Sequence, residues 1–374
     1  MTDLMNSAAF IGRLQAKMEQ RQAEKDTRKW DAATIAAKIK TRVIGQDHIA
    51  DYVSQIIARK AARRVKKGTI INLMISGVTG TGKSETAKAI AEAMFGSEDY
   101  MLQIDCGNLG TGEAALASLV GSAAVYSGAS KGTIADYLNK TKGEGVILFD
   151  EFEKACPTKD APVAKMLLKL LDEAKFQSQY DMQTYDASGC VIILTSNLKA
   201  KELSDAAQQI TDGEELEVVA RRILSDSMAP EFMERIDVIT TTRPLSDSDR
   251  ARIVTLHFQK LAKSHECEVV DVGDGFFDLL VEGAERFGQT STRGVIRWLG
   301  KVCDDAFIEC VNDRKIKRVV ADFVDGQLIL TQADAPRVSA GAPAPVRQAE
   351  APRASTPRSG YTPPVADRDD KSFF

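Results

Sequence analysis

The sequence lacks any segment typical of membrane insertion or export. No run approaches the ~18 apolar residues that a membrane-spanning helix needs. The N-terminus, MTDLMNSAAFIGRLQ, has no apolar core of the kind found in signal peptides. We therefore expect a cytoplasmic protein that makes no contact with a membrane.

Cysteine and histidine are scarce, and their positions do not suggest a metal site. The chain has six cysteines and three histidines, and no cysteine pair has the C-x-x-C spacing of a zinc or redox site. His48, His257 and His265 add no ligand spacing to the cysteines. We expect the cysteines to be small buried hydrophobic residues in a reducing compartment.

A positive net charge is also absent. Lysine and arginine total 49 against 53 aspartates and glutamates, so no global positive field attracts nucleic acid or acidic lipid. One basic run, RKAARRVKK at residues 59–67, has the composition of a nucleic-acid contact in a helicase loader. Because no aromatic residue interrupts it, we interpret it as a solvated helix face or a subunit contact and do not expect nucleic acid as a partner.

Short apolar segments alternate with longer helical ones from residue 69 onward. Their near-continuous hydrophobicity is typical of strands that are buried on both faces. We therefore predict an α/β fold, in which a five-stranded parallel sheet lies between helices within a large nucleotide-binding domain, residues 36–245. The five strand candidates are residues 69–76, 100–105, 145–150, 190–196 and 237–242.

The pattern becomes mostly helical after Arg243-Pro244, and we predict a small lid domain over residues 246–333. Its last two segments, KRVVADF and QLILTQ, are joined by an Asp-Gly pair that favours a hairpin turn. Residues 334–374 are rich in proline and alanine and should be disordered. Residues 1–35 read as a charged helical extension, in which Asp31 can cap the helix that follows.

A phosphate-binding motif lies directly after the first strand candidate. Residues 77–84, GVTGTGKS, match G-x-x-x-x-G-K-[ST] between a strand and a helix. Its backbone N–H groups should point at phosphate oxygens, Lys83 should reach the β- and γ-phosphates of ATP, and the Ser84 hydroxyl should bind Mg²⁺. The predicted ATP-binding residues of this segment are Gly77, Val78, Thr79, Gly80, Thr81, Gly82, Lys83, Ser84 and Glu85.

Carboxylates and a polar strand end complete the predicted site. The apolar strand VILFDE ends in Asp150, a candidate Mg²⁺ ligand, and Glu151, a candidate base for the attacking water. A helix cap is the alternative interpretation of this acidic pair. Asn197, in Thr-Ser-Asn after the next strand, could contact the γ-phosphate or simply form a turn. The combination favours an ATP hydrolase over a small-molecule kinase.

Five motifs in this order and spacing resemble the Clp family of AAA+ ATPases. The resemblance spans about residues 36–332 and is strongest to the second ATPase module of the disaggregase ClpB, here expected as a stand-alone module. It implies an AAA+ P-loop domain followed by a lid. The motifs are Val43–Asp47, the P-loop, Leu148–Ala155, Thr195–Asn197 and Pro230–Asp237.

The resemblance also implies roles for individual residues. Val43 and Ile44 would line the adenine pocket, and Asn197 would be sensor 1. Arg235 would be the arginine finger that reaches the nucleotide of a neighbouring subunit, which requires a ring, usually a hexamer; a surface salt bridge is the alternative. Arg293 would be sensor 2, although its neighbours depart from the Gly-Ala-Arg-Pro of the family.

The substrate contact implied by the resemblance is Tyr126, in a segment similar to the family's pore loop. A packed core or interface residue is the alternative. No Ile/Leu-Gly-Phe loop lies between Asn197 and Pro230, so we do not predict a Clp peptidase partner. The predicted function is ATP-dependent unfolding or remodelling of protein substrates, bound directly or through an adaptor. A nucleic-acid motor or loader and a nucleotide-dependent assembly scaffold are the alternatives.

Overall fold

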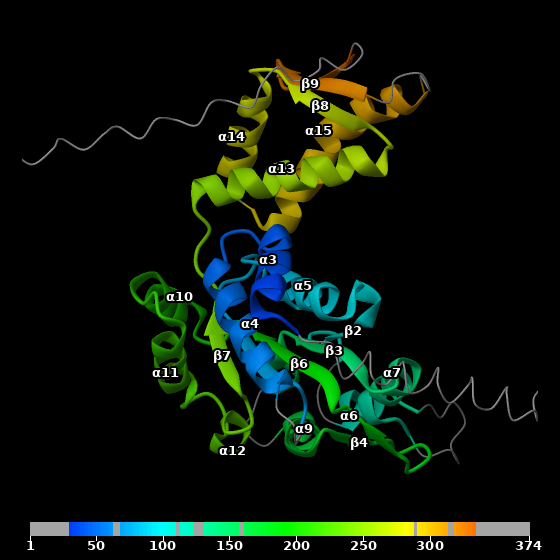
Figure 1. Cartoon of the computed structure of the whole chain (residues 1–374), viewed down its shortest axis with the longest axis vertical. Helices are drawn as coiled ribbons and strands as arrows, with labels where there is room; N and C mark the ends of the chain where they lie inside the picture. The colour runs from blue at the N-terminus through cyan, green and yellow to red at the C-terminus, as the bar shows by residue number, and fades with distance from the viewer. Residues whose placement is uncertain are drawn as a thin grey trace, which may run out of the picture. The chain divides into compact units, whose positions relative to one another are not determined.

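A five-stranded parallel sheet forms the centre of the larger part of the chain (Figure 1). Its strand order is β2-β3-β6-β1-β7, and every pair of neighbours is parallel. The fold class and all five strands predicted from the sequence are confirmed. The strands are β1 (Ile71–Ser76), β2 (Met101–Asp105), β3 (Glu144–Asp150), β6 (Gly189–Ser196) and β7 (Val238–Thr241).

The computed structural model describes only part of the chain. The described residues are 30–62, 68–109, 113–122, 131–156, 161–287, 290–312 and 318–333. Tyr126, most of the basic run, most of the N-terminal extension and the C-terminal tail therefore lie outside them, and the expectations for these segments stay predictions.

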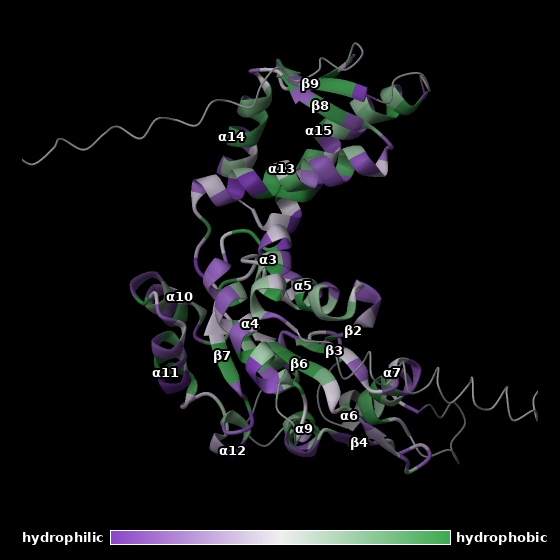
Figure 2. Cartoon of the chain, in the orientation of Figure 1, coloured by the Kyte–Doolittle hydropathy of each residue, from purple (hydrophilic) through white to green (hydrophobic). Residues whose placement is uncertain are grey.

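An apolar cluster packs on each face of the sheet, which explains the continuous hydrophobicity of its strands. Strands β3 and β6 are coloured largely as hydrophobic in Figure 2. On β3, Val146 and Leu148 belong to one buried cluster while Ile147 and Phe149 belong to another, on the opposite face. The first cluster includes residues of α3 (Ala32–Arg42), α4 (Asp47–Ala61) and α5 (Lys83–Phe95). The second includes residues of α6 (Glu113–Val120), α7 (Thr133–Thr141), α8 (Phe152–Ala155), α9 (Pro162–Glu173), α10 (Ala200–Gln209), α11 (Gly213–Leu224) and α12 (Pro230–Met233).

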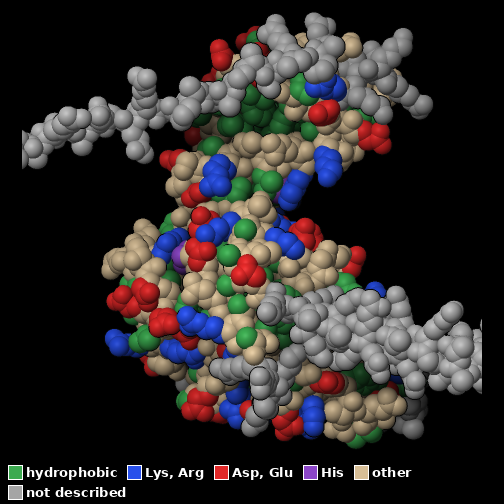
Figure 3. Space-filling view, viewed as in Figure 1, with side chains coloured by type: hydrophobic (Ala, Val, Ile, Leu, Met, Phe, Trp, Pro, Cys, Tyr) green, Lys and Arg blue, Asp and Glu red, His purple; other side chains and the backbone are tan. Residues whose placement is uncertain are grey.

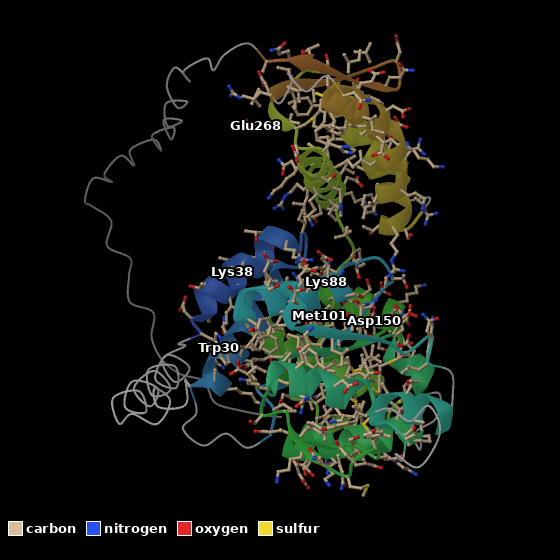
Figure 4. All side chains as sticks on the ribbon, turned by 90° about the vertical axis from the view of Figure 1, so that its right-hand side faces the viewer. Trp30, Lys38, Lys88, Met101, Asp150 and Glu268 are labelled. Atoms are coloured by element: carbon tan, nitrogen blue, oxygen red, sulfur yellow. The ribbon has the colours of Figure 1, made fainter. Side chains whose placement is uncertain are left out.

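The predicted cap of α3 is present. The Asp31 side chain accepts a hydrogen bond of 2.8 Å from the backbone N–H of Thr34, which satisfies one of the free donors at the start of the helix. Just before the cap, the Trp30 ring packs edge-on against Phe95 of α5, with 6.2 Å between ring centroids (Figure 4). The segment that enters the sheet domain is thereby fixed against α5.

The C-terminal part has a hydrophobic core of its own, centred on Phe258 and Phe307. Asp325 and Gly326 take positive φ angles in the turn of the β-hairpin, so the hairpin predicted from this pair is confirmed. An additional strand pairs in parallel with the first strand of the hairpin and was not predicted. The elements are α13 (Asp247–Ser264), β8 (Glu268–Val272), α14 (Phe276–Arg286), α15 (Thr292–Asn312), β9 (Arg318–Val324) and β10 (Gln327–Gln332).

Two small elements of the larger part were also not predicted from the sequence. They are the hairpin of β4 (Lys175–Gln177) with β5 (Thr184–Asp186), and the 3-10 helix η1 (Glu98–Tyr100). The described residues up to Gln332 belong to one unit. The finer domain boundaries at 35, 245 and 333 stay a prediction.

All six cysteines are free, and five of them are buried; Cys156 is partly exposed. Among the described residues, no group of three or more His, Cys, Asp or Glu side chains could hold a metal ion. The helices of the described chain include none that is both long and apolar enough to span a membrane.

Candidate nucleotide site

The P-loop connects the end of β1 to the start of α5. Helix α5 begins at Lys83, and no side chain caps its N-terminus, where Gly82 has φ 99°. The N–H groups of a first helical turn have no intrahelical acceptor, so this terminus suits an anion. Gly77 is required where the loop leaves the strand, because a Cβ atom there would lie 2.1 Å from Oγ1 of Thr242.

Lys83 is buried at the base of the loop, with 8% of its surface exposed. Its Nζ donates to the carbonyl oxygens of Gly77 (2.7 Å) and Val78 (3.0 Å) and to Oδ1 of Asn197 (2.9 Å). Burial lowers the pKa of Lys83, and the carboxylates nearby, of which Glu153 acts most strongly, partly oppose this. A buried ammonium group held only by neutral acceptors fits the binding of a further anion.

Asp150 ends β3 and is held by donors from three other elements (Figure 4). Ser84 Oγ lies 2.9 and 3.0 Å from its two carboxylate oxygens. Thr195 Oγ1 donates to Oδ1 at 2.5 Å, and Gln103 Nε2 donates to Oδ2 at 3.1 Å. A serine hydroxyl beside a carboxylate fits Mg²⁺, which binds one or two protein oxygens and takes its other ligands from phosphate and water.

Glu151 leaves the strand in a backbone conformation that few residues other than glycine adopt. Its φ is 55°, and its N–H donates to Thr195 Oγ1 at 3.0 Å. Its carboxylate forms an ion pair with Lys154 and lines the same cleft as the P-loop. Left-handed backbone at a bulky residue costs about 1 kcal/mol or more and persists where surrounding contacts enforce it.

Asn197 connects the P-loop to a second acidic residue. Its Oδ1 accepts from Lys83 and from Thr79 Oγ1 (3.2 Å), while its Nδ2 donates to Glu153 Oε1 at 3.0 Å. The other carboxylate oxygen of Glu153 is buried, and no described residue forms a hydrogen bond with it. The alternative of a simple turn does not account for this network, because the amide connects the P-loop to Glu153 of α8, the short helix that follows β3.

These residues surround a cleft of about 400 Å³. Thr292 Oγ1, at the start of α15, donates to the Gly80 carbonyl at 2.7 Å and so ties the lid helix to the P-loop. Burial lowers the pKa of His257, which lines the same cleft. The apolar lining residues are Val43, Ile44, Leu245, Ile253, Leu256 and Ile296, and the cationic ones are Arg42, Lys83, Lys88, Lys260 and Arg293.

Arg235 does not line this cleft. It lies instead at a second pocket of about 210 Å³ together with Lys60 and Asn72. One guanidinium nitrogen donates to the Glu231 carbonyl at 2.5 Å, and the buried Nε has no hydrogen-bond partner in the part of the chain that the structure describes. No carboxylate among the described residues pairs with Arg235, so the salt-bridge interpretation finds no partner within the part of the chain that the structure covers.

The structure thus brings together the residues predicted for the chain's own ATP site. Arg235, predicted to act on a neighbouring subunit, lies apart from them, and Tyr126, predicted for the pore loop, lies outside the described residues. Three residues of the site were not predicted from the sequence: Arg42 and Gln103, which line the cleft, and Glu153, which bonds to Asn197. Glu153 stood within a recognised motif, and Gln103 is a polar residue inside an otherwise apolar strand segment, so both left a weak signal.

Comparison with known proteins agrees with this geometry. A family model described as an AAA domain (Cdc48 subfamily) matches residues 68–239. ClpC of Staphylococcus epidermidis, the ATP-binding subunit of the ATP-dependent Clp protease, is 31% identical over 283 residues, which is 73% of this chain and 34% of ClpC. ClpC of Staphylococcus aureus is 32% identical over 300 residues, 76% of this chain and 36% of ClpC.

The chain carries an AAA+ ATPase module of the Clp/Hsp100 family. It spans about a third of the length of the curated relatives that it matches. Two Hsp104 structures have the same fold as this AAA+ module. A closed state with ATPγS and FITC-casein has a TM-score of 0.64 at 24% identity, covering 80% of this chain and 51% of that one. An extended casein complex from S. cerevisiae has a TM-score of 0.65 at 23% identity, covering 82% and 53%.

Proposed function

We propose that this AAA+ module binds ATP in the cleft between the P-loop and the lid helices and hydrolyses it. The observation that carries the proposal is the junction of β3 and β6, where one hydroxyl, that of Thr195, holds both Asp150 and Glu151. Val43 and Ile44 provide an apolar wall for the adenine, and the P-loop with Lys83 provides the phosphate cradle.

Ser84 and Asp150 are the residues that would hold Mg²⁺. The ion would neutralise charge on the phosphate oxygens as the terminal phosphate is transferred. Gln103 and Thr195 keep the Asp150 carboxylate oriented toward Ser84, so the protein's contribution is a fixed pair of oxygens.

Glu151 is proposed as the base that orients and deprotonates the attacking water. Its backbone is fixed by Thr195, and Lys154 pairs with its carboxylate. Asn197 is proposed to sense the γ-phosphate, because its side chain accepts a hydrogen bond from Lys83, the P-loop residue that is expected to reach that phosphate. Arg293, exposed on the cleft side of α15, is proposed to sense it from the lid.

We further propose that the module acts within a ring, usually a hexamer in this family, and remodels protein substrates. Arg235 lines a pocket other than its own nucleotide cleft, and its Nε has no hydrogen-bond partner among the described residues, which supports a finger supplied to a neighbouring subunit. Hsp104 was solved with casein, a protein substrate. Tyr126 is proposed to contact the threaded chain, as an amphipathic aromatic side chain can.

The charges of the described surface do not favour a nucleic-acid motor. Arg59 faces Glu214 at 4.0 Å, and Lys60 forms an ion pair with Asp237. On the face shown in Figure 3, basic and acidic side chains are interspersed. Protein is therefore the proposed substrate class.

Replacement of Glu151 by Gln tests the proposed chemistry. Because the amide cannot accept a proton, ATP turnover should fall by about 10²-fold or more, while binding of ATP is retained. Turnover and the Kd of a fluorescent ATP analogue would be measured with Glu173→Gln, an exposed glutamate on α9, as the matched control. Parental turnover in Glu151→Gln would exclude Glu151 as the base.

A further inference from the structure

The segment that carries Arg235 is held through its backbone by a buried amide. Asn72, only 4% exposed, lies in β1. Its Nδ2 donates to the carbonyl oxygens of Arg235 (2.9 Å) and Leu171 (3.0 Å), and its Oδ1 accepts from Thr69 Oγ1 at 2.7 Å. Both N–H donors of this amide are therefore used, and two of the three bonds fix the backbone around it.

A guanidinium group holds the same segment from the other side. Arg221 of α11 donates to the carbonyls of Met233 (3.0 Å), Ile236 (2.7 Å) and Asp237 (3.2 Å). Glu217 orients Arg221 by accepting from its Nε at 2.8 Å and from a terminal nitrogen at 2.6 Å.

Glu217 is held in turn by Tyr52 of α4, whose hydroxyl donates to it at 2.6 Å. The chain Tyr52–Glu217–Arg221 thus connects α4, α11 and the segment 233–237. Such a relay fixes Arg221 in one orientation, because each member loses a hydrogen bond if the next one moves.

The backbone at Arg235 is thus fixed, while the buried Nε of its side chain has no hydrogen-bond partner within the described segments. The same β1 strand that holds the Arg235 carbonyl at its start leads into the P-loop at Gly77. Asp237 extends the attachment, since its N–H donates to the Asn72 carbonyl at 2.8 Å and its carboxylate accepts from the Asn72 N–H at 2.7 Å. A fixed backbone beneath a guanidinium group that pairs with no carboxylate of the described residues is an arrangement that preorganises a charged group for an external anion.

We infer that Asn72 and Arg221 are positioning residues that aim Arg235 at the nucleotide of the neighbouring subunit. The inference rests on the proposed function, in which Arg235 is supplied in trans. Neither residue touches the nucleotide cleft of its own chain, so their loss should weaken the finger while leaving nucleotide binding unchanged.

Mixed assemblies test this inference. Lys83→Ala disables a subunit's own nucleotide site but leaves its finger, whereas Arg235→Ala does the reverse, so the two should restore each other's ATPase activity. Arg221→Gln alone should lose about tenfold in turnover with the Kd of a fluorescent ATP analogue within about twofold of the parent. Mixed with Lys83→Ala it should recover activity, and mixed with Arg235→Ala it should not.

Two further variants make the test specific. Arg222→Gln, on the adjacent exposed position of α11, should match the parent in every mixture. Asn72→Asp keeps the acceptor for Thr69 but presents no N–H to the Arg235 carbonyl, and it should behave like Arg221→Gln. Amide hydrogen exchange should rise for residues 233–237 in both positioning variants and stay unchanged at the P-loop.

Each other outcome has a distinct meaning. Recovery of Arg221→Gln by Arg235→Ala in place of Lys83→Ala would assign its defect to its own nucleotide site and overturn the inference. If neither partner restores the activity of Arg221→Gln, Asn72 and Arg221 have a purely structural role, and the inference is also overturned. Failure of Lys83→Ala and Arg235→Ala to restore each other would overturn the finger in trans itself, and the inference with it.

Discussion

A single hydroxyl, that of Thr195, connects the two carboxylates of the candidate site. It donates to Asp150 at 2.5 Å and accepts from the N–H of Glu151 at 3.0 Å. Thr195→Val keeps the shape of the side chain but leaves the Glu151 N–H and one Asp150 oxygen without this partner. We expect the free energy of unfolding to fall by about 1–3 kcal/mol and ATP turnover by about tenfold.

Chemical denaturation and steady-state ATPase assays would measure the two effects, with Thr195→Ser as the control that retains the hydroxyl. A Thr195→Val protein with parental turnover would contradict the positioning of Glu151 by this residue.

Residues of the site were predictable where their spacing along the chain is fixed by one turn. Lys83 and Ser84 follow the glycines of one loop, and Asp150 ends one apolar strand, so each was predicted. Gln103 reaches Asp150 because β2 pairs with β3. In this pairing, Asp105 of β2 lies opposite Asp150 of β3. Cross-strand contacts of this kind depend on strand order, which the sequence pattern did not specify.

At the scale of elements, α3 is joined to the P-loop helix by an arginine among carboxylates. Arg42 lies at the C-terminus of α3 and contacts Glu85 (2.6 Å), Glu92 (2.9 Å) and Glu98, with 14% of its side chain exposed. Burial lowers the pKa of Arg42, but the carboxylates, Glu98 foremost, raise it by more, so it stays charged. Val43 follows directly and lines the cleft.

Arg42→Gln should therefore affect both stability and nucleotide affinity. Three carboxylates would face one another without a cation, and we expect a loss of about 1–3 kcal/mol in the free energy of unfolding. The KM for ATP should rise more than kcat falls, because the wall formed by Val43 and Ile44 loses its anchor to α5. Urea denaturation and ATPase kinetics would measure these changes.

Lys40→Gln is the matched control on the same helix. Lys40 pairs with Asp51 on the surface, where such pairs contribute about 0–1 kcal/mol. Equal losses of stability in Arg42→Gln and Lys40→Gln would contradict a structural role for the arginine cluster.

The strands of the main sheet were predictable because burial on both faces leaves an uninterrupted apolar segment. Strand β8 was not, since its residues Glu268–Val272 are mostly exposed and include two acids. This strand forms because it pairs with β9. The register of the pairing shifts between Val269 and Asp271. The three-residue strands β4 and β5 are too short to produce a period.

At the scale of the whole molecule, motifs predicted the family, but contacts between subunits leave no comparable pattern in one sequence. Arg235 was assigned by resemblance, and the structure adds only that it lies away from its own cleft. Two residues hold its backbone, Asn72 of β1 and Arg221 of α11. They are 149 positions apart in the sequence. No local spacing could have connected them.

The proposed coupling of ATP turnover to protein substrates depends on Tyr126. Tyr126→Ala should bind and hydrolyse ATP at about the parental basal rate, because every described ATP-site contact lies elsewhere, but casein should no longer stimulate it. Tyr126→Phe keeps the aromatic face and should retain stimulation. The assay compares turnover with unfolded casein and with single-stranded DNA. Stimulation by DNA alone would indicate a nucleic-acid motor, and an assembly activity unchanged in Tyr126→Ala would indicate a scaffold, because neither requires an aromatic grip on an extended polypeptide.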